Sequence, residues 1–97
     1  MKVLLVCAGG MSTSILMKKL EKHAAEKGID FEIAATGISS YLDICHSYDV
    51  ILLAPQVSYH KDRIAEQSKM PLALIPPADY GIGNCVNIFK LIDKALA

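Results

Sequence analysis

The chain has 97 residues, a common length for one domain, and 53% of them are hydrophobic, which is enough to build a core. Ten basic and ten acidic residues cancel, so no net positive field favours non-specific binding to nucleic acid. Aromatic residues make up only 6%, a poor supply for a platform that stacks bases or flavin. We expect a single domain over residues 1–97 and no nucleic-acid partner.

The three cysteines are odd in number and widely spaced, which predicts free thiols rather than a disulfide framework or a zinc site. We expect no metal and no cofactor. No stretch approaches the ~20 apolar residues that a membrane-spanning helix needs. The apolar run at the N-terminus is too short for a signal peptide and leads into a glycine loop. The sequence therefore predicts a cytoplasmic protein without direct membrane insertion.

The first half of the chain combines short apolar runs with one amphipathic segment. A short apolar run without alternation is typical of a strand covered on both faces. In the amphipathic segment the apolar side chains share one helical face, and most lysines and glutamates lie away from it. We expect a hydroxyl side chain at positions 12–14 to cap this helix and Gly28 to end it. In chain order we predict a strand at Lys2–Val6, a helix at Ser14–Lys27 and a strand at Phe31–Ala35.

The second half repeats this alternation of strands and helices. Ser40 and Asp43 are spaced like a capping box at the start of a short helix. The clearest apolar run stops at Pro55, and the last helix has a well-defined apolar stripe. In chain order we predict a helix at Ser40–His46, a strand at Asp49–Ala54, a helix at Ser58–Ser68, a strand at Leu72–Ile75 and a helix at Asn84–Leu96.

Alternation of strands and helices predicts an α/β fold with a parallel sheet. We expect a three-layer sandwich in which a four-stranded parallel sheet, in the order 2-1-3-4, carries helices on both faces. Ligands of such sheets bind beyond the carboxyl ends of the strands. Cys7 follows the central strand directly, and we expect the segments 55–60 and 76–83 to border the same edge.

The stretch after the first strand combines a thiol, glycines and hydroxyl groups at this favoured position. The start of a helix carries unpaired N–H groups and a partial positive charge, which bind phosphate and favour a thiolate nucleophile. Glycines let the backbone approach an anion closely, and hydroxyls donate further hydrogen bonds. We therefore predict that Cys7 is the catalytic nucleophile. The predicted phosphate-binding residues are Ala8, Gly9, Gly10, Met11, Ser12, Thr13 and Ser14.

Two alternatives use the same residues differently. A cysteine-dependent phosphatase or arsenate-reductase-like enzyme would attack with the same thiol, and Asp79 is the one candidate acid for its leaving group. Low-molecular-weight tyrosine phosphatases, however, place an arginine where this chain has Thr13, and arginine stabilises the charge that develops in phosphoryl transfer. A non-catalytic module of flavodoxin-like shape, with Cys7 simply buried, is the other alternative. Slow hydrolysis without the arginine favours a phosphoryl carrier.

Two motifs carry a resemblance to a known family. Cys7 with Gly10-Met11-Ser12-Thr13-Ser14, and later Leu53-Ala54-Pro55-Gln56-Val57-Ser58-Tyr59, are similar to segments of the IIB component of the lactose/cellobiose (chitobiose) type of bacterial sugar phosphotransferase system. A weaker likeness continues at Asp79-Tyr80-Gly81. The resemblance extends over essentially the whole chain. It implies a fold similar to that of low-molecular-weight tyrosine phosphatases.

The resemblance also implies a function and two partners. A phosphohistidine on a IIA protein would give its phosphoryl group to Cys7, and the phosphocysteine would pass it to a sugar of the cellobiose, lactose or chitobiose class. That sugar would be held by the membrane IIC permease. Such a protein is a protein-phosphocysteine–sugar phosphotransferase component and needs no metal or cofactor.

The remaining polar and thiol residues receive smaller roles. We expect a pocket or a partner interface at Gln56, Tyr59, Asp79 and Tyr80. Cys45 and Cys85 fall on apolar helical positions and are predicted to be core residues, and His23 to be a partly solvated packing residue. His46 and His60 lack a glycine-hydroxyl cradle, which argues against a role as phosphate acceptors.

Overall fold

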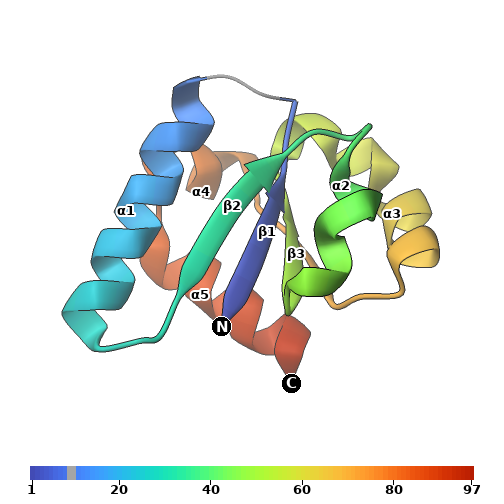
Figure 1. Ribbon diagram of the computed structural model, residues 1–97. Helices are drawn as coiled ribbons and strands as arrows, with labels where there is room; N and C mark the ends of the chain where they lie inside the picture. The colour runs from blue at the N-terminus through green and yellow to red at the C-terminus, as the bar shows by residue number, and fades with distance from the viewer. Residues whose placement is uncertain (9–10) are drawn as a thin grey trace.

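A four-stranded parallel sheet forms the centre of the protein (Figure 1). The computed structural model describes residues 1–8 and 11–97. The strand order is β2-β1-β3-β4, and all three strand pairs are parallel, which confirms the predicted topology. The strands are β1 (Lys2–Val6), β2 (Glu32–Thr36), β3 (Val50–Leu53) and β4 (Leu72–Leu74).

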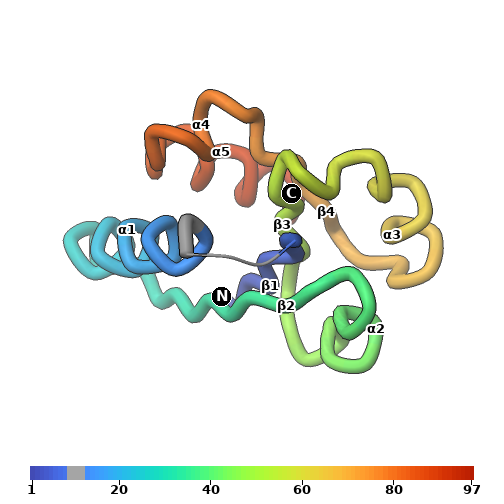
Figure 2. The backbone as a smooth tube through the Cα atoms, turned by 90° about the horizontal axis from the view of Figure 1, so that it is seen from above, coloured from blue at the N-terminus to red at the C-terminus, as the bar shows by residue number. Residues whose placement is uncertain are grey.

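Helices cover both faces of this sheet, so the predicted three-layer arrangement is confirmed (Figure 2). Two groups lie on opposite sides in this view: α1, α4 and α5 on one side, α2 and α3 on the other. The likeness to tyrosine phosphatases stays a prediction. The helices are α1 (Met11–Lys27), α2 (Tyr41–Ile44), α3 (Lys61–Ser68), α4 (Pro77–Ile82) and α5 (Cys85–Leu96), with 3-10 turns η1 (Cys45–Ser47) and η2 (Pro55–His60).

The apolar runs form strands because alternate side chains enter two separate cores. Val3 and Leu5 of β1 pack with α1 and α5, whereas Leu4 and Val6 pack with the residues of α2 and α3. Neighbouring side chains of a strand point to opposite faces, so a strand between two helical layers needs apolar residues at every position. All of β3 is fully buried for the same reason.

The first helix begins earlier than predicted. α1 starts at Met11 rather than Ser14, so the hydroxyl residues at 12–14 lie within its first turn and the prediction that one of them caps it was wrong. The prediction began the helix at the first residue of the regular apolar spacing. A helix can start earlier than this spacing, because polar residues are compatible with its first turn. Gly28 follows the helix with a φ of 67°, which confirms its predicted place at the C-terminus.

The segment after β4 contains a helix, α4, for which the sequence analysis made no prediction. Pro77 occupies the start of α4, where its fixed φ favours a helix and its missing N–H costs nothing. Gly83 ends the helix in the left-handed conformation, with a φ of 65°. The two adjacent prolines suggested only that a strand had ended. α4 therefore brings ordered side chains to the carboxyl edge of the sheet.

Other differences are confined to the ends of elements. The helix predicted from Ser58 begins at Lys61, because residues 55–60 form the 3-10 turn η2. Ser40 precedes α2 but makes no side-chain cap, so the predicted capping box was wrong. The N–H groups of Ser40 and Tyr41 instead bond to the carbonyl oxygen of Gly37.

In residues 1–8 and 11–97, no helix combines the length and the apolar character that crossing a bilayer requires.

Candidate functional site

The thiol of Cys7 lies at the carboxyl end of the central strand β1. Its main chain continues the sheet: the N–H of Cys7 donates to the Thr36 carbonyl at 3.0 Å, and the N–H of Ala54 donates to the Val6 carbonyl at 3.0 Å. The Sγ atom also lies 3.7 Å from the Thr36 oxygen. Hydrogen bonds from strands on both sides thus fix the backbone that carries the thiol.

A small pocket opens beside this thiol. It has a volume of about 270 Å³, and we call it the thiol pocket. Cys7 itself is only 4% exposed, and it lines this pocket. The lining residues are Cys7, Ala8, Thr13, Ser14, Ala35, Thr36 and Gly37.

The first turn of α1 supplies the polar wall of the thiol pocket. Thr13 is 4% exposed, while Ser14 and Ala8 are exposed at the surface. This turn contains no acidic side chain, so nothing within it offsets the positive end of the helix dipole. Of the predicted phosphate-binding residues, Gly9 and Gly10 lie outside the described residues. For Met11 and Ser12 the structure describes the backbone, which belongs to this turn.

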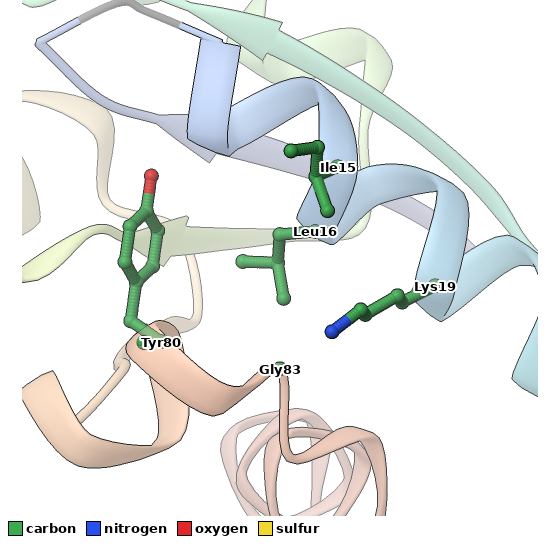
Figure 3. Close-up of a pocket in the computed structure, with 6 residues that line it drawn as sticks. Ile15, Leu16, Lys19, Tyr80 and Gly83 are labelled. Carbon is green, nitrogen blue, oxygen red and sulfur yellow. The ribbon is translucent and has the colours of Figure 1, made fainter.

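A second, smaller pocket lies between α1 and α4 (Figure 3). It has a volume of about 150 Å³, and we call it the tyrosine pocket. The Tyr80 hydroxyl points toward the beginning of α1 and lies 2.9 Å from Thr13 Oγ1. Lys19 reaches across from α1 to α4, with Nζ 3.5 Å from the Ile82 carbonyl oxygen. The lining residues are Ile15, Leu16, Lys19, Tyr80, Gly81 and Gly83.

Asp79 lies in α4 and is not among the residues that line the thiol pocket. The residue is 9% exposed, and its carboxylate accepts hydrogen bonds from the side-chain amides of Asn84, at 3.3 Å, and Asn87. The N–H of Asn87 donates to Asn84 Oδ1 at 3.2 Å, which caps α5. Because Asp79 is occupied in joining α4 to α5, it is poorly placed as an acid for a leaving group.

Gln56 and Tyr59 lie on the exposed turn η2, which follows β3 at the same edge of the sheet. Neither residue lines the thiol pocket. Tyr59 is 79% exposed, and its ring centroid lies 4.1 Å from that of His60. Such an exposed aromatic side chain suits contact with a partner more than contact with a group bound at Cys7.

Sequence reasoning missed the contribution of the segment after β2. The carbonyl of Thr36 accepts from Cys7, and Thr36 and Gly37 line the thiol pocket. The predicted strand order already placed this segment beside β1, so the topology offered a signal. Asn84 and Asn87 gave no comparable signal, because their partner Asp79 belongs to a helix that was not predicted.

The other two thiols differ from Cys7 in their surroundings. Cys45 is fully buried, as predicted, and burial raises the pKa of its thiol. Cys85 is partly buried, and burial likewise raises its pKa, although nearby Lys19 acts in the opposite direction. His23 is partly exposed and stacks on Phe89 with centroids 5.2 Å apart, as expected of a packing residue.

No cluster of three or more His, Cys, Asp or Glu side chains suited to a metal ion occurs in the described part of the chain. The Nε2 atom of His46 lies 3.2 Å from the Ser68 carbonyl oxygen. His46 is not among the residues that line the thiol pocket. The chemical groups among the residues that line the thiol pocket are the thiol of Cys7 and the hydroxyls of Thr13, Ser14 and Thr36, beside a helix N-terminus.

These features define a parallel α/β protein with a cysteine at the carboxyl edge of the sheet, beside a helix N-terminus. The chain matches the family of lactose/cellobiose-specific IIB subunits of the phosphotransferase system over residues 2–91, and it belongs to that family. It is 38% identical over 88 residues to the galactose-specific EIIB component of Lactococcus lactis subsp. cremoris (strain MG1363), covering 82% of each chain.

Two further comparisons extend this assignment. The solution structure of the cellobiose-specific phosphotransferase IIB component from Borrelia burgdorferi is 37% identical and superposes with a TM-score of 0.81, covering 99% of this chain and 91% of that one. The lactose-specific EIICB component of Lactococcus lactis subsp. lactis is 35% identical over 74 residues, which are 75% of this chain and 13% of that protein.

Proposed function

We propose that this protein is a phosphoryl carrier of sugar uptake, in which Cys7 accepts a phosphoryl group from a IIA phosphohistidine and passes it to a sugar. The observation that carries the proposal is the position of the Cys7 thiol, which opens into a pocket walled by the first turn of α1. Membership in the IIB family supports a phosphotransferase role in general terms. The transfer itself, the residues and the partners are our inference.

The proposed chemistry consists of two displacements at phosphorus. In the first, the Cys7 thiolate forms an S–P bond while the P–N bond to the donor histidine breaks, and the imidazole keeps the electron pair. In the second, a sugar hydroxyl forms an O–P bond while the S–P bond breaks, which restores the thiolate and releases the hydroxyl proton. Such transfers need mainly positioning and stabilisation of charge.

The wall of the thiol pocket suits a carrier better than a hydrolase. A helix N-terminus without acidic residues in its first turn stabilises a phosphoryl dianion. The only arginine in the sequence, Arg63, lines a different pocket together with Tyr41 and His60. Without an arginine on the phosphoryl group, attack by water is expected to be slow, so the phosphocysteine survives until a sugar arrives.

Two partners follow from this role. A relative that joins IIB to IIC in one EIICB chain supports a membrane IIC partner for the separate IIB protein. The phosphohistidine donor is a IIA protein, and both exchanges take place on the cytoplasmic side. The relatives carry different sugars in their names, among them galactose, cellobiose and lactose. We therefore assign the choice of sugar to the IIC partner and the phosphoryl transfer to this chain.

The test is the intact mass after incubation with phosphoenolpyruvate, the general phosphotransferase proteins and a IIA protein of a lactose/cellobiose system. We expect one added phosphoryl group on the native protein and none on Cys7→Ser. Cys85→Ser serves as the matched control, because it removes a partly buried thiol outside the thiol pocket and leaves phosphorylation intact. Unmodified native protein in the presence of a IIA that phosphorylates another IIB would overturn the proposal.

A further inference from the structure

The hydrogen bond between Thr13 and Tyr80 joins a residue that lines the thiol pocket to a residue that lines the tyrosine pocket. Thr13 comes from α1 and lines the thiol pocket, while Tyr80 comes from α4 and lines the tyrosine pocket. Their oxygens lie 2.9 Å apart across 67 residues of sequence. Thr13 is 4% exposed, so this tyrosine is the partner that the structure gives to a nearly buried hydroxyl.

A hydroxyl group has one hydrogen, so the direction of this bond decides what Thr13 can still do. If Thr13 donates to Tyr80, the Thr13 hydroxyl has no hydrogen left and cannot donate a hydrogen bond to a phosphoryl oxygen. If Tyr80 donates, the hydrogen of Thr13 stays available. A phenol is a stronger acid than an aliphatic alcohol and is therefore the better donor of the two.

We propose that Tyr80 is a positioning residue: it donates its hydroxyl hydrogen to Thr13 Oγ1, which aims the hydrogen of Thr13 at a phosphoryl oxygen on Cys7. The inference rests on the proposed function and adds a residue to that site. Donation from Tyr80 also polarises the Thr13 hydroxyl, because each bond in a chain of hydroxyls strengthens the next. Two hydrogen bonds thus follow one another, from Tyr80 to Thr13 and from Thr13 to the phosphoryl oxygen. We call this pair of bonds the relay; it transfers no proton.

The surroundings of Tyr80 hold its ring in place. Its ring packs against both cores, and its N–H donates to the Pro76 carbonyl at 3.0 Å. The neighbouring Asp79 ties α4 to α5 through Asn84 and Asn87. Because these contacts already order the tyrosine side chain in the folded protein, it loses little further conformational entropy when it aligns Thr13. The buried carboxylate that sequence reasoning offered as an acid is therefore part of the support for Tyr80.

The first experiment compares Tyr80→Phe with the native protein in single-turnover phosphorylation of Cys7 by a phosphorylated IIA protein. We expect transfer to be about five- to ten-fold slower, the effect of one neutral hydrogen bond. Tyr41→Phe is the matched control, because Tyr41 also uses its hydroxyl in a side-chain bond, 2.8 Å from Gln67 Oε1, but lies outside the thiol pocket. The control should transfer at the native rate.

A cycle of variants separates positioning from a structural role. Thr13→Val removes the hydroxyl at nearly constant shape and should slow transfer about ten- to hundred-fold, whereas Thr13→Ser keeps the hydroxyl and should retain most of the rate. Because Tyr80 acts through Thr13, adding Tyr80→Phe to Thr13→Val should cause no further loss. Urea unfolding of each variant measures stability independently.

Three results would overturn the relay: a native rate in Tyr80→Phe, a double variant whose losses multiply, or equal losses in Tyr80→Phe and Tyr41→Phe. A Tyr80→Phe protein that is less stable but transfers at the native rate would reduce Tyr80 to a packing residue. These outcomes are distinct from failure of the proposed function, since in that case the native protein itself would gain no phosphoryl group on Cys7.

Discussion

The three thiols of this protein show how environment separates chemically identical side chains. Cys7 opens into a pocket beside a helix N-terminus. Cys45 is enclosed in the core between the sheet and the helices α2 and α3. Burial favours the neutral form of a thiol, whereas a positive helix end favours the thiolate. Among the three thiols we therefore propose Cys7 as the nucleophile, because it is the one that lines a pocket beside a helix N-terminus.

The buried thiol makes a prediction about stability at alkaline pH. Burial raises the pKa of Cys45 above its ordinary value of 9.0, so the unfolded chain releases this proton at a lower pH than the folded protein. The stability that Cys45 contributes is complete below pH 9.0 and is lost as the pH rises toward the folded pKa. Between pH 9.0 and the folded pKa, the free energy of unfolding of the native protein should fall relative to that of Cys45→Ala by at most about 1.4 kcal/mol per pH unit.

Urea unfolding of both proteins at pH 7, 9 and 10 under reducing conditions measures this difference. Other groups that titrate in this range are common to the two chains and cancel in the comparison. A constant gap between the native protein and Cys45→Ala across the series would contradict the assigned direction of the shift.

At the residue scale, the sequence correctly placed Cys7 at the carboxyl end of β1, while its role as nucleophile stays a prediction. The prediction rested on a thiol, glycines and hydroxyls that follow a strand without interruption. The Thr36 carbonyl beside Cys7 was missed, because every residue has a carbonyl and the sequence does not mark this one. The pairing of Thr13 with Tyr80 was missed for another reason: it joins residues 67 apart through a helix that was not predicted.

At the scale of elements, the two helix-ending glycines form a natural comparison. Gly28 and Gly83 both have positive φ, at 67° and 65°, a conformation that costs other residues about 1 kcal/mol. They differ in the space around them. A Cβ at Gly28 would meet no atom within 4 Å, whereas one at Gly83 would lie 2.7 Å from Lys19 Cδ.

We expect Gly28→Ala to lower the free energy of unfolding by about 1 kcal/mol and Gly83→Ala to lower it by more. Only the second substitution must displace Lys19, whose stem closes the tyrosine pocket. Chemical denaturation of both variants under one set of conditions gives the comparison. Equal costs would show that Lys19 moves aside freely.

Elements were predicted best where apolar spacing was regular. The strands β1 and β3 and the last helix followed directly from their apolar patterns, with ends shifted by about a residue, within the usual disagreement on boundaries. α4 was missed because Pro76 and Pro77 end a strand as readily as they begin a helix, and six residues give too short a pattern to tell.

At the scale of the whole molecule, the sheet couples two cores, one packed mainly with α1 and α5 and the other with α2 and α3. Leu20 of α1 lies in one core and Ile64 of α3 in the other, and both are almost fully buried. The strands β1 and β3 contribute alternate side chains to each core. Loss of either core would expose one face of the same strands, so we expect the molecule to unfold as one unit.

Leu20→Ala and Ile64→Ala should each lower the free energy of unfolding by about 2–5 kcal/mol. Far-ultraviolet circular dichroism and tyrosine fluorescence should report the same midpoint in each variant. Val86→Ala is the control, because Val86 is 54% exposed and its loss should change stability by at most about 0.5 kcal/mol. Separate midpoints in Ile64→Ala would show that the two layers unfold independently.

The strand order could be predicted because parallel α/β topology leaves few choices. Crossovers are right-handed, and the strands with the most continuous apolar runs must lie in the centre. Those runs belong to β1 and β3, which are the central pair. The side strand β2 is less apolar, and its Glu32 and Ala35 are exposed. Pocket shape depends instead on loop and helix ends, which such patterns do not describe.

The bonds that hold Cys7 between two strands also bear on how partners meet it. Its N–H and the preceding carbonyl are both engaged in the sheet, so the main chain at the thiol has already lost its conformational freedom on folding. A visiting protein need not order that backbone, and association is spared this entropic cost. For the proposed carrier, which would bind two partners in turn, this rigid backbone favours reversible encounters whose specificity depends on shape rather than on induced folding.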